Sequence, residues 1–278
     1  MLNSADCQRV AELMRETAAA ELLPRFRSLA KAEIRQKRSG DFVTVADIAS
    51  EQRLAAGLAK ILPGVPMVGE EAVEKDPGLL DLIARPGEMC WVVDPLDGTK
   101  NFAEGNDRFA MIICLVHDTV SVGGWILDVA HGRMAIALEG QGVTLDEIPV
   151  RRRKVEQPPN GYVGFNVCQE FDRQLPPEQR RRLGGVYPGS CSGIEYLEIL
   201  SGRADFNLYT RAMPWDHAAG TLMLTEAGGE GRRLDGQVYG PSQPTTGGVI
   251  AAIHPQVWSE VRIAFEAVRM PQARPEKV

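Results

Sequence analysis

The sequence of 278 residues lacks the features that mark several large classes of protein. It has no apolar run of about 18 residues, the length that a membrane-spanning helix needs. It also does not open with a charged stretch followed by an apolar one, as secretory signals do. We therefore expect a cytoplasmic protein without membrane contact. The net charge of -6 argues against a general nucleic-acid binder, so nucleic acid is not an expected partner.

Cysteine and histidine are sparse and scattered. The five cysteines are odd in number and form no C-x-x-C pair, which favours free thiols in a reducing compartment. The four histidines lack the spacing of metal ligands. A cysteine phosphatase needs C-x5-R, but Leu197 stands six residues after Cys191. The segment "GSCSG" around Cys191 formally fits a nucleophile elbow, a motif that also needs a preceding strand and a partner histidine.

Hydrophobic periodicity predicts helices and strands that do not alternate strictly, which favours a layered α+β fold. A helix is expected over residues 6–38, kinked or split at Pro24. The segment "TVAD" opens a second helix, which continues to about Leu62. The tail from Met270 is expected to fray. Further strands are predicted at 109–116, 119–128, 133–138, 161–166, 204–209 and 247–253, and further helices at 177–183, 191–201, 216–227 and 255–268.

The segment "WVVDPLDGTKNF" carries an apolar strand directly into two aspartates, Asp94 and Asp97. Residues three apart on an extended strand face opposite sides. Pro95 and Gly98 both favour a change of direction, which would bring the two carboxylates together. The Leu96 carbonyl can point the same way. Three hard oxygen donors within four residues suit Mg²⁺.

Other acids occupy similar settings: Glu70 and Glu71 in "MVGEE", Asp216 in "MPWDHAAG" and Asp47 in "TVADIASE". Each also has a purely structural interpretation, as a helix cap for Asp47 and Asp216 or as a solvated loop residue for Glu71. If the acids converge, their repulsion requires bound protons or cations. Only Lys100 lies within the motifs to neutralise them. Divalent metals held by shared acids are a device of phosphoryl transfer.

These motifs resemble those of the inositol monophosphatase family, a group of Mg²⁺-dependent, Li⁺-sensitive phosphatases. "DPLDGT" matches its D-P-[IL]-D-G-T signature, and "GEE" and "WDHAAG" match its other two motifs in the same order. About 24 residues separate Glu70 from Asp94, and about 120 separate Asp94 from Asp216. The resemblance spans Asp47 to Gly229. It implies a layered αβαβα sandwich of the inositol monophosphatase and fructose-1,6-bisphosphatase type, and a homodimer.

The resemblance implies two or three Mg²⁺ ions with shared ligands. Glu70, Asp94 and the Leu96 carbonyl would hold one ion. Asp94, Asp97 and Asp216 would hold a second, and Glu70 would help to hold a weaker third. The implied enzyme is a metal-dependent phosphoric monoester hydrolase.

The resemblance also implies catalytic and phosphate-binding roles. Asp47 and Thr99 would orient or deprotonate the attacking water, so that no covalent phosphoenzyme forms. Glu70 is the third residue expected to be catalytic. The backbone N–H groups of Gly98 and Thr99, with Asp97 beside them, would contact the phosphate.

The loop of Gly189, Ser190 and Cys191 would line the substrate pocket. In inositol-specific members an acidic residue seven positions before the W-D aspartate binds a ring hydroxyl, and Tyr209 stands there in this chain. A tyrosine cannot accept hydrogen bonds as a carboxylate does, so the substrate stays open. Arg211 could meet a second phosphate or a carboxylate, or be a solvated surface residue.

A charged, proline-containing stretch, "RRRKVEQPPNG", indicates a boundary. The expected parts are residues 1–155, an α+β half with Asp47, Glu70 and the "DPLDGT" motif, and residues 156–278, an α/β half with the substrate loop and Asp216.

The function expected from these residues is Mg²⁺-dependent hydrolysis of a small phosphate monoester, such as an inositol, polyol or sugar phosphate. A bisphosphate (fructose 1,6-bisphosphate or 3'-phosphoadenosine 5'-phosphate) or histidinol phosphate is the alternative substrate. A non-enzymatic alternative is a regulatory protein for the RNA machinery. The basic residues 151–154 and 180–182 could bind an acidic partner, or they could be solvated charges.

Overall fold

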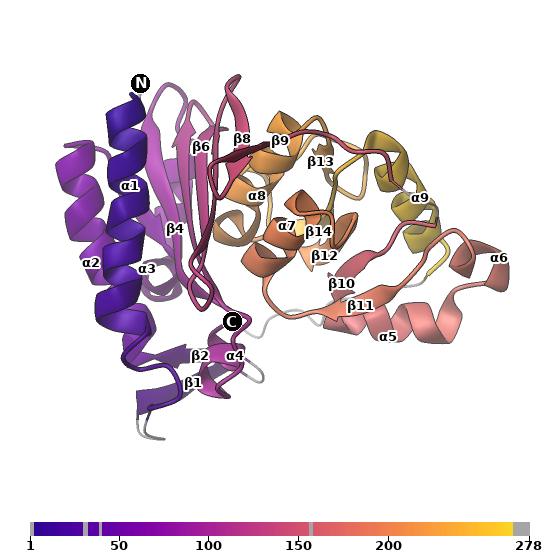
Figure 1. Ribbon diagram of the computed structural model, residues 1–278, viewed down its shortest axis with the longest axis horizontal. Helices are drawn as coiled ribbons and strands as arrows, with labels where there is room; N and C mark the ends of the chain where they lie inside the picture. The colour runs from indigo at the N-terminus through magenta and orange to yellow at the C-terminus, as the bar shows by residue number, and fades with distance from the viewer. Residues whose placement is uncertain (1–2, 30–32, 39–40, 156–157, 269–278) are drawn as a thin grey trace.

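A computed structural model describes residues 3–29, 33–38, 41–155 and 158–268. The tail predicted to fray from Met270 lies outside these residues. No helix in the described ranges has the length and apolar character needed to cross a membrane. As Figure 1 shows, layers of helices and sheets follow one another along the long axis of the molecule.

The N-terminal region contains less helix than predicted. Helix α1 (Ser4–Thr17) starts with a capping box at Asn3 and continues as a π-helical segment (Ala18–Leu22). Pro24 follows after Leu23, the C-cap of this segment, and a proline ring does not fit inside a continuing helix. Strands β1 (Ile34–Arg38) and β2 (Asp41–Thr44) then form an antiparallel pair. The prediction of helix up to residue 38 was therefore wrong.

Helix α2 (Val45–Ile61) begins where the sequence predicts. Thr44 is its N-cap and accepts a hydrogen bond from the Ala46 N–H at 3.1 Å. The Asp47 carboxylate reaches back to the Thr44 N–H at 2.8 Å, which completes a capping box. The cap therefore fixes Asp47 in the first turn of α2.

A seven-stranded sheet, in the order β3-β4-β5-β6-β7-β8-β9, forms the centre of the N-terminal half. Only β3 and β4 pair in parallel, and the remaining neighbours are antiparallel. The meander predicted over residues 109–138 is thus confirmed. The strands are β3 (Met67–Gly69), β4 (Met89–Asp97), β5 (Ala110–His117), β6 (Val120–Asp128), β7 (Arg133–Leu138), β8 (Gly142–Leu145) and β9 (Ile148–Val150).

A five-stranded mixed sheet, in the order β11-β10-β12-β14-β13, forms the centre of the C-terminal half. Its strands are β10 (Gly161–Gly164), β11 (Val186–Gly189), β12 (Phe206–Arg211), β13 (Glu230–Arg232) and β14 (Thr246–Ala252). The remaining helices are α3 (Glu70–Lys75), a 3₁₀ segment (Pro77–Ala84), α4 (Thr99–Ala103), α5 (Phe165–Gln174), α6 (Pro177–Arg180), α7 (Ser192–Leu200), α8 (Pro214–Glu226) and α9 (Pro255–Glu266).

Three hydrophobic clusters hold the layers together. Successive residues of β4 point to opposite faces of the sheet, so Trp91 packs with α1 and α2, whereas Val92 packs with α7 and α8. The outer face of the second sheet packs on α5 and α9 through residues such as Phe206 and Trp258. The layers run α1/α2, seven-stranded sheet, α7/α8, five-stranded sheet, α5/α9 (Figure 1). The predicted αβαβα sandwich is therefore confirmed.

The division into two parts at residue 155 stays a prediction. Each sheet lies on its own side of the boundary, over residues 67–150 and 161–252. Helix α8, however, packs directly on β5, β6 and β7 of the first sheet. The two parts therefore share a core.

Candidate active site

The carboxyl end of β4 turns sharply at its two aspartates. The pairing with β5 shifts register between Asp94 and Asp97, which places an extra residue on β4. The Asp94 Oδ1 accepts a hydrogen bond from the Leu96 N–H at 2.9 Å, as in an Asx turn. Both aspartates consequently face the same cavity of about 520 Å³.

Gly98 makes this turn possible. Its φ of +84° lies in the left-handed region, which disfavours residues with a Cβ. A Cβ at this position would also lie 2.8 Å from the Arg108 carbonyl oxygen and 3.3 Å from the Cys191 Sγ. The backbone therefore leaves room only for glycine where β4 leads into α4.

Acids from three further helices reach the same cavity or its wall. Glu70 is the first residue of α3, and Asp216 lies in the first turn of α8. The predicted site residues that line the cavity are Glu70, Asp94, Leu96, Asp97, Gly98, Thr99, Tyr209, Arg211 and Asp216. Asp47, on α2, is buried just behind Thr99.

The electrostatics of this cluster are unfavourable for negative charge. Burial, and then the charges of Glu70, Asp97 and Asp216, raise the pKa of Asp94 well above its usual range. Burial and the neighbouring charges of Asp97 and Glu70 do the same to the pKa of Asp216. A bound cation would remove this repulsion, because an opposite charge within a few ångströms favours the ionised form.

The donor chemistry fits Mg²⁺, because every candidate ligand is a hard oxygen. The carboxylates do not form a finished coordination shell, however. Within the described ranges, no three or more His, Cys, Asp or Glu side chains are arranged as a metal-binding group. Asp94 and Asp216 lie close enough for each to shift the pKa of the other. The predicted assignment of ligands to individual ions therefore stays a prediction.

Asp47 and Thr99 form a direct pair. The Thr99 Oγ1 lies 2.9 Å from the Asp47 Oδ1 and 2.9 Å from the Leu96 carbonyl oxygen, and its single proton can be donated to only one of them. The second oxygen of Asp47 accepts from the N–H and the hydroxyl of Thr44, at 2.8 and 2.6 Å. Burial raises the pKa of Asp47 to about 7, although these hydrogen bonds oppose the rise.

The start of α7 holds Asp97, a contact that the sequence did not reveal. The Asp97 Oδ2 accepts from the Gly193 N–H at 2.6 Å and lies 3.0 Å from the Ser192 Oγ. The Cys191 Sγ lies 3.2 Å from the same oxygen. A serine and a glycine at a helix start do offer free donors, which is the signal that could have indicated this role.

Cys191 is not set up as a nucleophile. Burial raises the pKa of its thiol well above the usual value, and the nearby charge of Asp97 raises it further. The thiol is therefore protonated near neutral pH, whereas a nucleophilic cysteine acts as the thiolate.

The predicted substrate residues divide into two groups. Tyr209 and Arg211 line the cavity from β12. Gly189, Ser190 and Cys191 are not among its lining residues, because their loop lies behind Asp97 and Gly98. Their part in substrate binding stays a prediction.

Glu195, in α7, was missed by the sequence analysis. Its carboxylate is fully buried and accepts hydrogen bonds from the Tyr209 hydroxyl at 2.8 and 2.7 Å. It also accepts from the Ser190 N–H at 3.0 Å and lies 3.4 Å from the Cys191 nitrogen. An acid on the apolar face of a predicted helix, in "IEYLEIL", was the available signal.

The chain folds in five layers, with an acidic cavity at the carboxyl end of β4 in its larger sheet. A model of the inositol monophosphatase family matches residues 5–266, and the chain belongs to that family. The structure of extragenic suppressor protein suhB from Bartonella henselae superposes with a TM-score of 0.78, over 95% of this chain and 99% of that one. At 21% identity this likeness shows the fold.

Two curated relatives extend the comparison. An inositol-1-monophosphatase of Caulobacter vibrioides is 28% identical over 262 residues, which cover 89% of this chain and 97% of that protein. Nus factor SuhB of Pseudomonas aeruginosa is 29% identical over 224 residues, which cover 76% of this chain and 80% of that protein. Family membership supports a phosphatase that acts on phosphate esters.

Proposed function

We propose that the protein hydrolyses a small phosphate monoester in a Mg²⁺-dependent reaction, by direct attack of water. The observation that carries this proposal is the meeting of Glu70, Asp94, Asp97 and Asp216 at one cavity, beside the Asp47–Thr99 pair. When bound, Mg²⁺ would neutralise negative charge on the phosphate and the leaving oxygen and would lower the pKa of water.

The proposed ligands follow the predicted sets. Glu70, Asp94 and the Leu96 carbonyl would hold one ion, and Asp94, Asp97 and Asp216 a second, with Glu70 contributing to a weaker third. The Leu96 carbonyl lies within 2.9 Å of the Thr99 hydroxyl, so the first ion and the water-orienting pair would be close neighbours.

Thr99 and Asp47 would position the attacking water. The Thr99 hydroxyl can accept a hydrogen bond from water while it donates to Asp47. Because the pKa of Asp47 is raised to about 7, this carboxyl group can accept a proton close to neutral pH. The backbone N–H groups of Gly98 and Thr99 would bind the phosphate.

The first-choice substrate is a polyol or sugar phosphate. Bisphosphates are one alternative, since Arg211 is exposed at the cavity and could bind a second anionic group. Histidinol phosphate is the other alternative. The Tyr209 hydroxyl is already bonded to Glu195, so it does not replace a free carboxylate in binding a ring hydroxyl.

Phosphate release from a panel of phosphate esters, with and without Mg²⁺, tests the proposal. We expect turnover that EDTA abolishes, that added Mg²⁺ restores and that Li⁺ inhibits. Asp97→Asn and Glu70→Gln should each lower kcat/KM by at least about 100-fold, because each removes charge that would stabilise the metal-assisted reaction. The exposed Asp235→Asn serves as a control without effect. Full turnover in EDTA would contradict the metal dependence.

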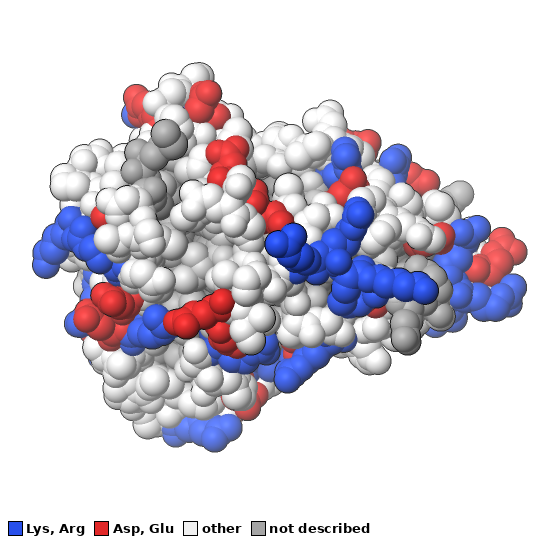
Figure 2. Space-filling model, turned by 45° about the horizontal axis from the view of Figure 1, so that its top comes forward, with Lys and Arg blue, Asp and Glu red and all other residues white. Residues whose placement is uncertain are grey.

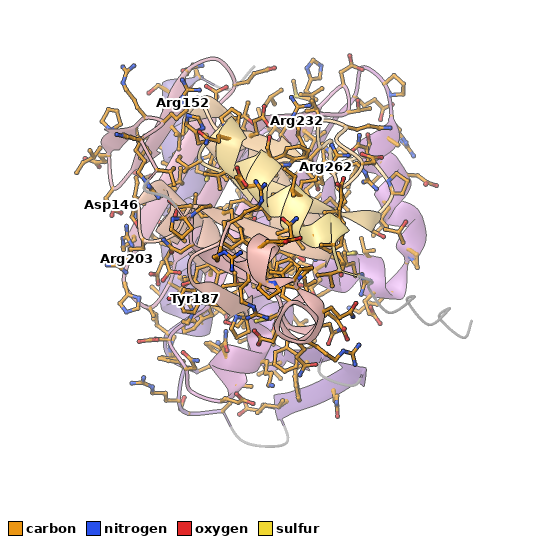
Figure 3. The ribbon with its side chains drawn as sticks, turned by 90° about the vertical axis from the view of Figure 1, so that its right-hand side faces the viewer. Asp146, Arg152, Tyr187, Arg203, Arg232 and Arg262 are labelled. Atoms are coloured by element: carbon orange, nitrogen blue, oxygen red, sulfur yellow. The ribbon has the colours of Figure 1, made fainter. Side chains whose placement is uncertain are left out.

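Basic side chains gather on one face of the C-terminal half, as Figure 2 shows. Two arginines are engaged within the protein: Arg153 bonds to Asp205 through its side chain, at 2.5 Å, and Arg182 pairs with Glu260 at 2.9 Å. Figure 3 shows the face that carries Arg232 and Arg262. The guanidinium carbon of each lies within 6.0 Å of the centre of the Trp258 ring.

The basic face and the relative named Nus factor SuhB together make binding of an acidic partner in the RNA machinery the second candidate function. The pairing of these arginines inside the protein weakens it. Asp94→Asn separates the two functions: it should abolish phosphate release and leave any partner binding unchanged.

A further inference from the structure

Glu195 is a carboxylate in an apolar position. It lies in α7 between Ile194 and Tyr196, which are both buried, and its own side chain is fully shielded from water. The structure shows no salt bridge to it within the described ranges. Burying such a group costs several kcal/mol unless hydrogen bonds compensate. Its pKa is raised to about 8, chiefly by burial.

The compensating donors come from two different segments. The Tyr209 hydroxyl, on β12, lies 2.8 Å from Oε1 and 2.7 Å from Oε2, so the two carboxylate oxygens bracket it. The Ser190 N–H, just after β11, donates to Oε1 at 3.0 Å. One buried side chain thus ties the loop after β11 to the strand that lines the cavity.

Gly189 completes this arrangement. A Cβ there would lie 2.7 Å from the Tyr209 Oη and 2.9 Å from the Glu195 Oε1, so the pair packs against the bare glycine backbone. Gly164, the partner of Gly189 in the β10–β11 ladder, has more space: its nearest neighbour would be the Tyr209 Cδ1 at 3.7 Å.

We infer that Glu195 is a positioning residue that holds Tyr209 and the 189–191 loop together as one rigid unit, in which Tyr209 forms part of the cavity wall and the loop supports it from behind. The inference rests on the proposed function for its effect on substrates. The Tyr209 hydroxyl is engaged by Glu195, so it is not free to donate a hydrogen bond to a substrate in the cavity. The unit selects among alcohols and takes no part in the attack on phosphorus.

Kinetics of four variants against esters that differ in their alcohol test this role. Glu195→Gln keeps the shape and can still bond to Tyr209 and Ser190, so KM should stay within about threefold. Glu195→Leu leaves those donors unpaired and should raise KM for the preferred ester about tenfold with little change in kcat. Gly189→Ala should resemble Glu195→Leu, and its matched control Gly164→Ala should resemble the wild type.

Two outcomes would overturn the inference. If Glu195→Leu, shown to be folded by thermal melting, keeps the wild-type KM and ester preference, the wall does not depend on Glu195. If Glu195→Gln strongly lowers kcat while KM stays unchanged, the charge of Glu195 acts in the chemistry and not in positioning. Should Glu195→Leu fail to fold, Gly189→Ala and Glu195→Gln decide the question by the same criteria.

Hydrogen exchange separates this inference from the proposed function. Amides of residues 187–193 should exchange about tenfold faster in Glu195→Leu than in the wild type, whether or not any ester is hydrolysed. A wild type without turnover on the whole panel would remove the proposed function and the role in selectivity. Unchanged exchange would remove the positioning role itself.

Discussion

Removing either partner of the Asp47–Thr99 pair should disable the same step. Asp47→Asn preserves the shape of the buried side chain, and its amide oxygen can still accept from the Thr44 N–H. The amide nitrogen would then face the Thr99 hydroxyl, which could no longer donate to position 47. Thr99→Val removes the hydroxyl and keeps the branched shape.

The expected size of the effect follows from the pair's proposed task. Positioned proton transfer contributes about 10²- to 10⁴-fold to rate, or about 3 to 5 kcal/mol of barrier. Because Thr99 would act on water through its bond to Asp47, each single substitution should lower kcat by that whole factor. The double variant should then be no worse than the poorer single variant, within about threefold.

The assay is phosphate release under saturating Mg²⁺ for the wild type, both single variants and the double variant. Thr99→Ser, which keeps the hydroxyl, should recover most of the rate. Thermal melting of each variant checks that the α2 capping box survives. If the losses in kcat multiply in the double variant, the two residues act independently. That result would refute the proposal that Thr99 acts on water through its bond to Asp47.

The remaining predictions concern stability. Gly98→Ala should destabilise more than Gly64→Ala in urea unfolding: both glycines have φ of +84°, but nothing lies within 4 Å of a Cβ at Gly64. Equal losses would show that the left-handed backbone, at about 1–2 kcal/mol, is the whole cost. At Glu198, burial acts to raise the pKa, but hydrogen bonds from Arg108 and Tyr162 outweigh it and lower the pKa below 4.5. The unfolded chain therefore takes up this proton first as the pH falls, so the wild-type advantage over Glu198→Gln should be full above about pH 5 and shrink towards about pH 3. A constant advantage across that range would contradict the lowered pKa.

The elements that the sequence predicted well carry their signal locally. Thr44 and Asp47 form a capping box within four residues, and the helix starts there in the structure. The antiparallel meander follows from apolar runs separated by tight turns at Asp118 and His131. The aspartates of "DPLDGT" are brought to one side by local backbone chemistry, at Pro95 and Gly98.

The errors arise where contacts between distant segments decide the structure. The segment Ile34–Arg38 pairs with the next strand, although its spacing also suits a helix. Residues after β10 form α5, because an apolar stripe that includes Val167 and Phe171 packs on the second sheet. Glu195 could not be placed from sequence, because its partner Tyr209 lies 14 residues away on another element.

For Asp47 and Asp216, a position at the start of a helix and a place at the candidate site do not exclude each other. Asp47, Glu70 and Asp216 each lie in the first turn of a helix, where the N-terminal dipole favours negative charge by about 0.3–1 kcal/mol. Three helices thus aim their positive ends at the acidic cavity and its wall. That gain is small beside the several kcal/mol that burying a charge costs. It therefore cannot hold Asp94 and Asp216 ionised together, which agrees with their raised pKa values. The fold gathers the carboxylates and leaves a deficit of positive charge that a bound dication would supply.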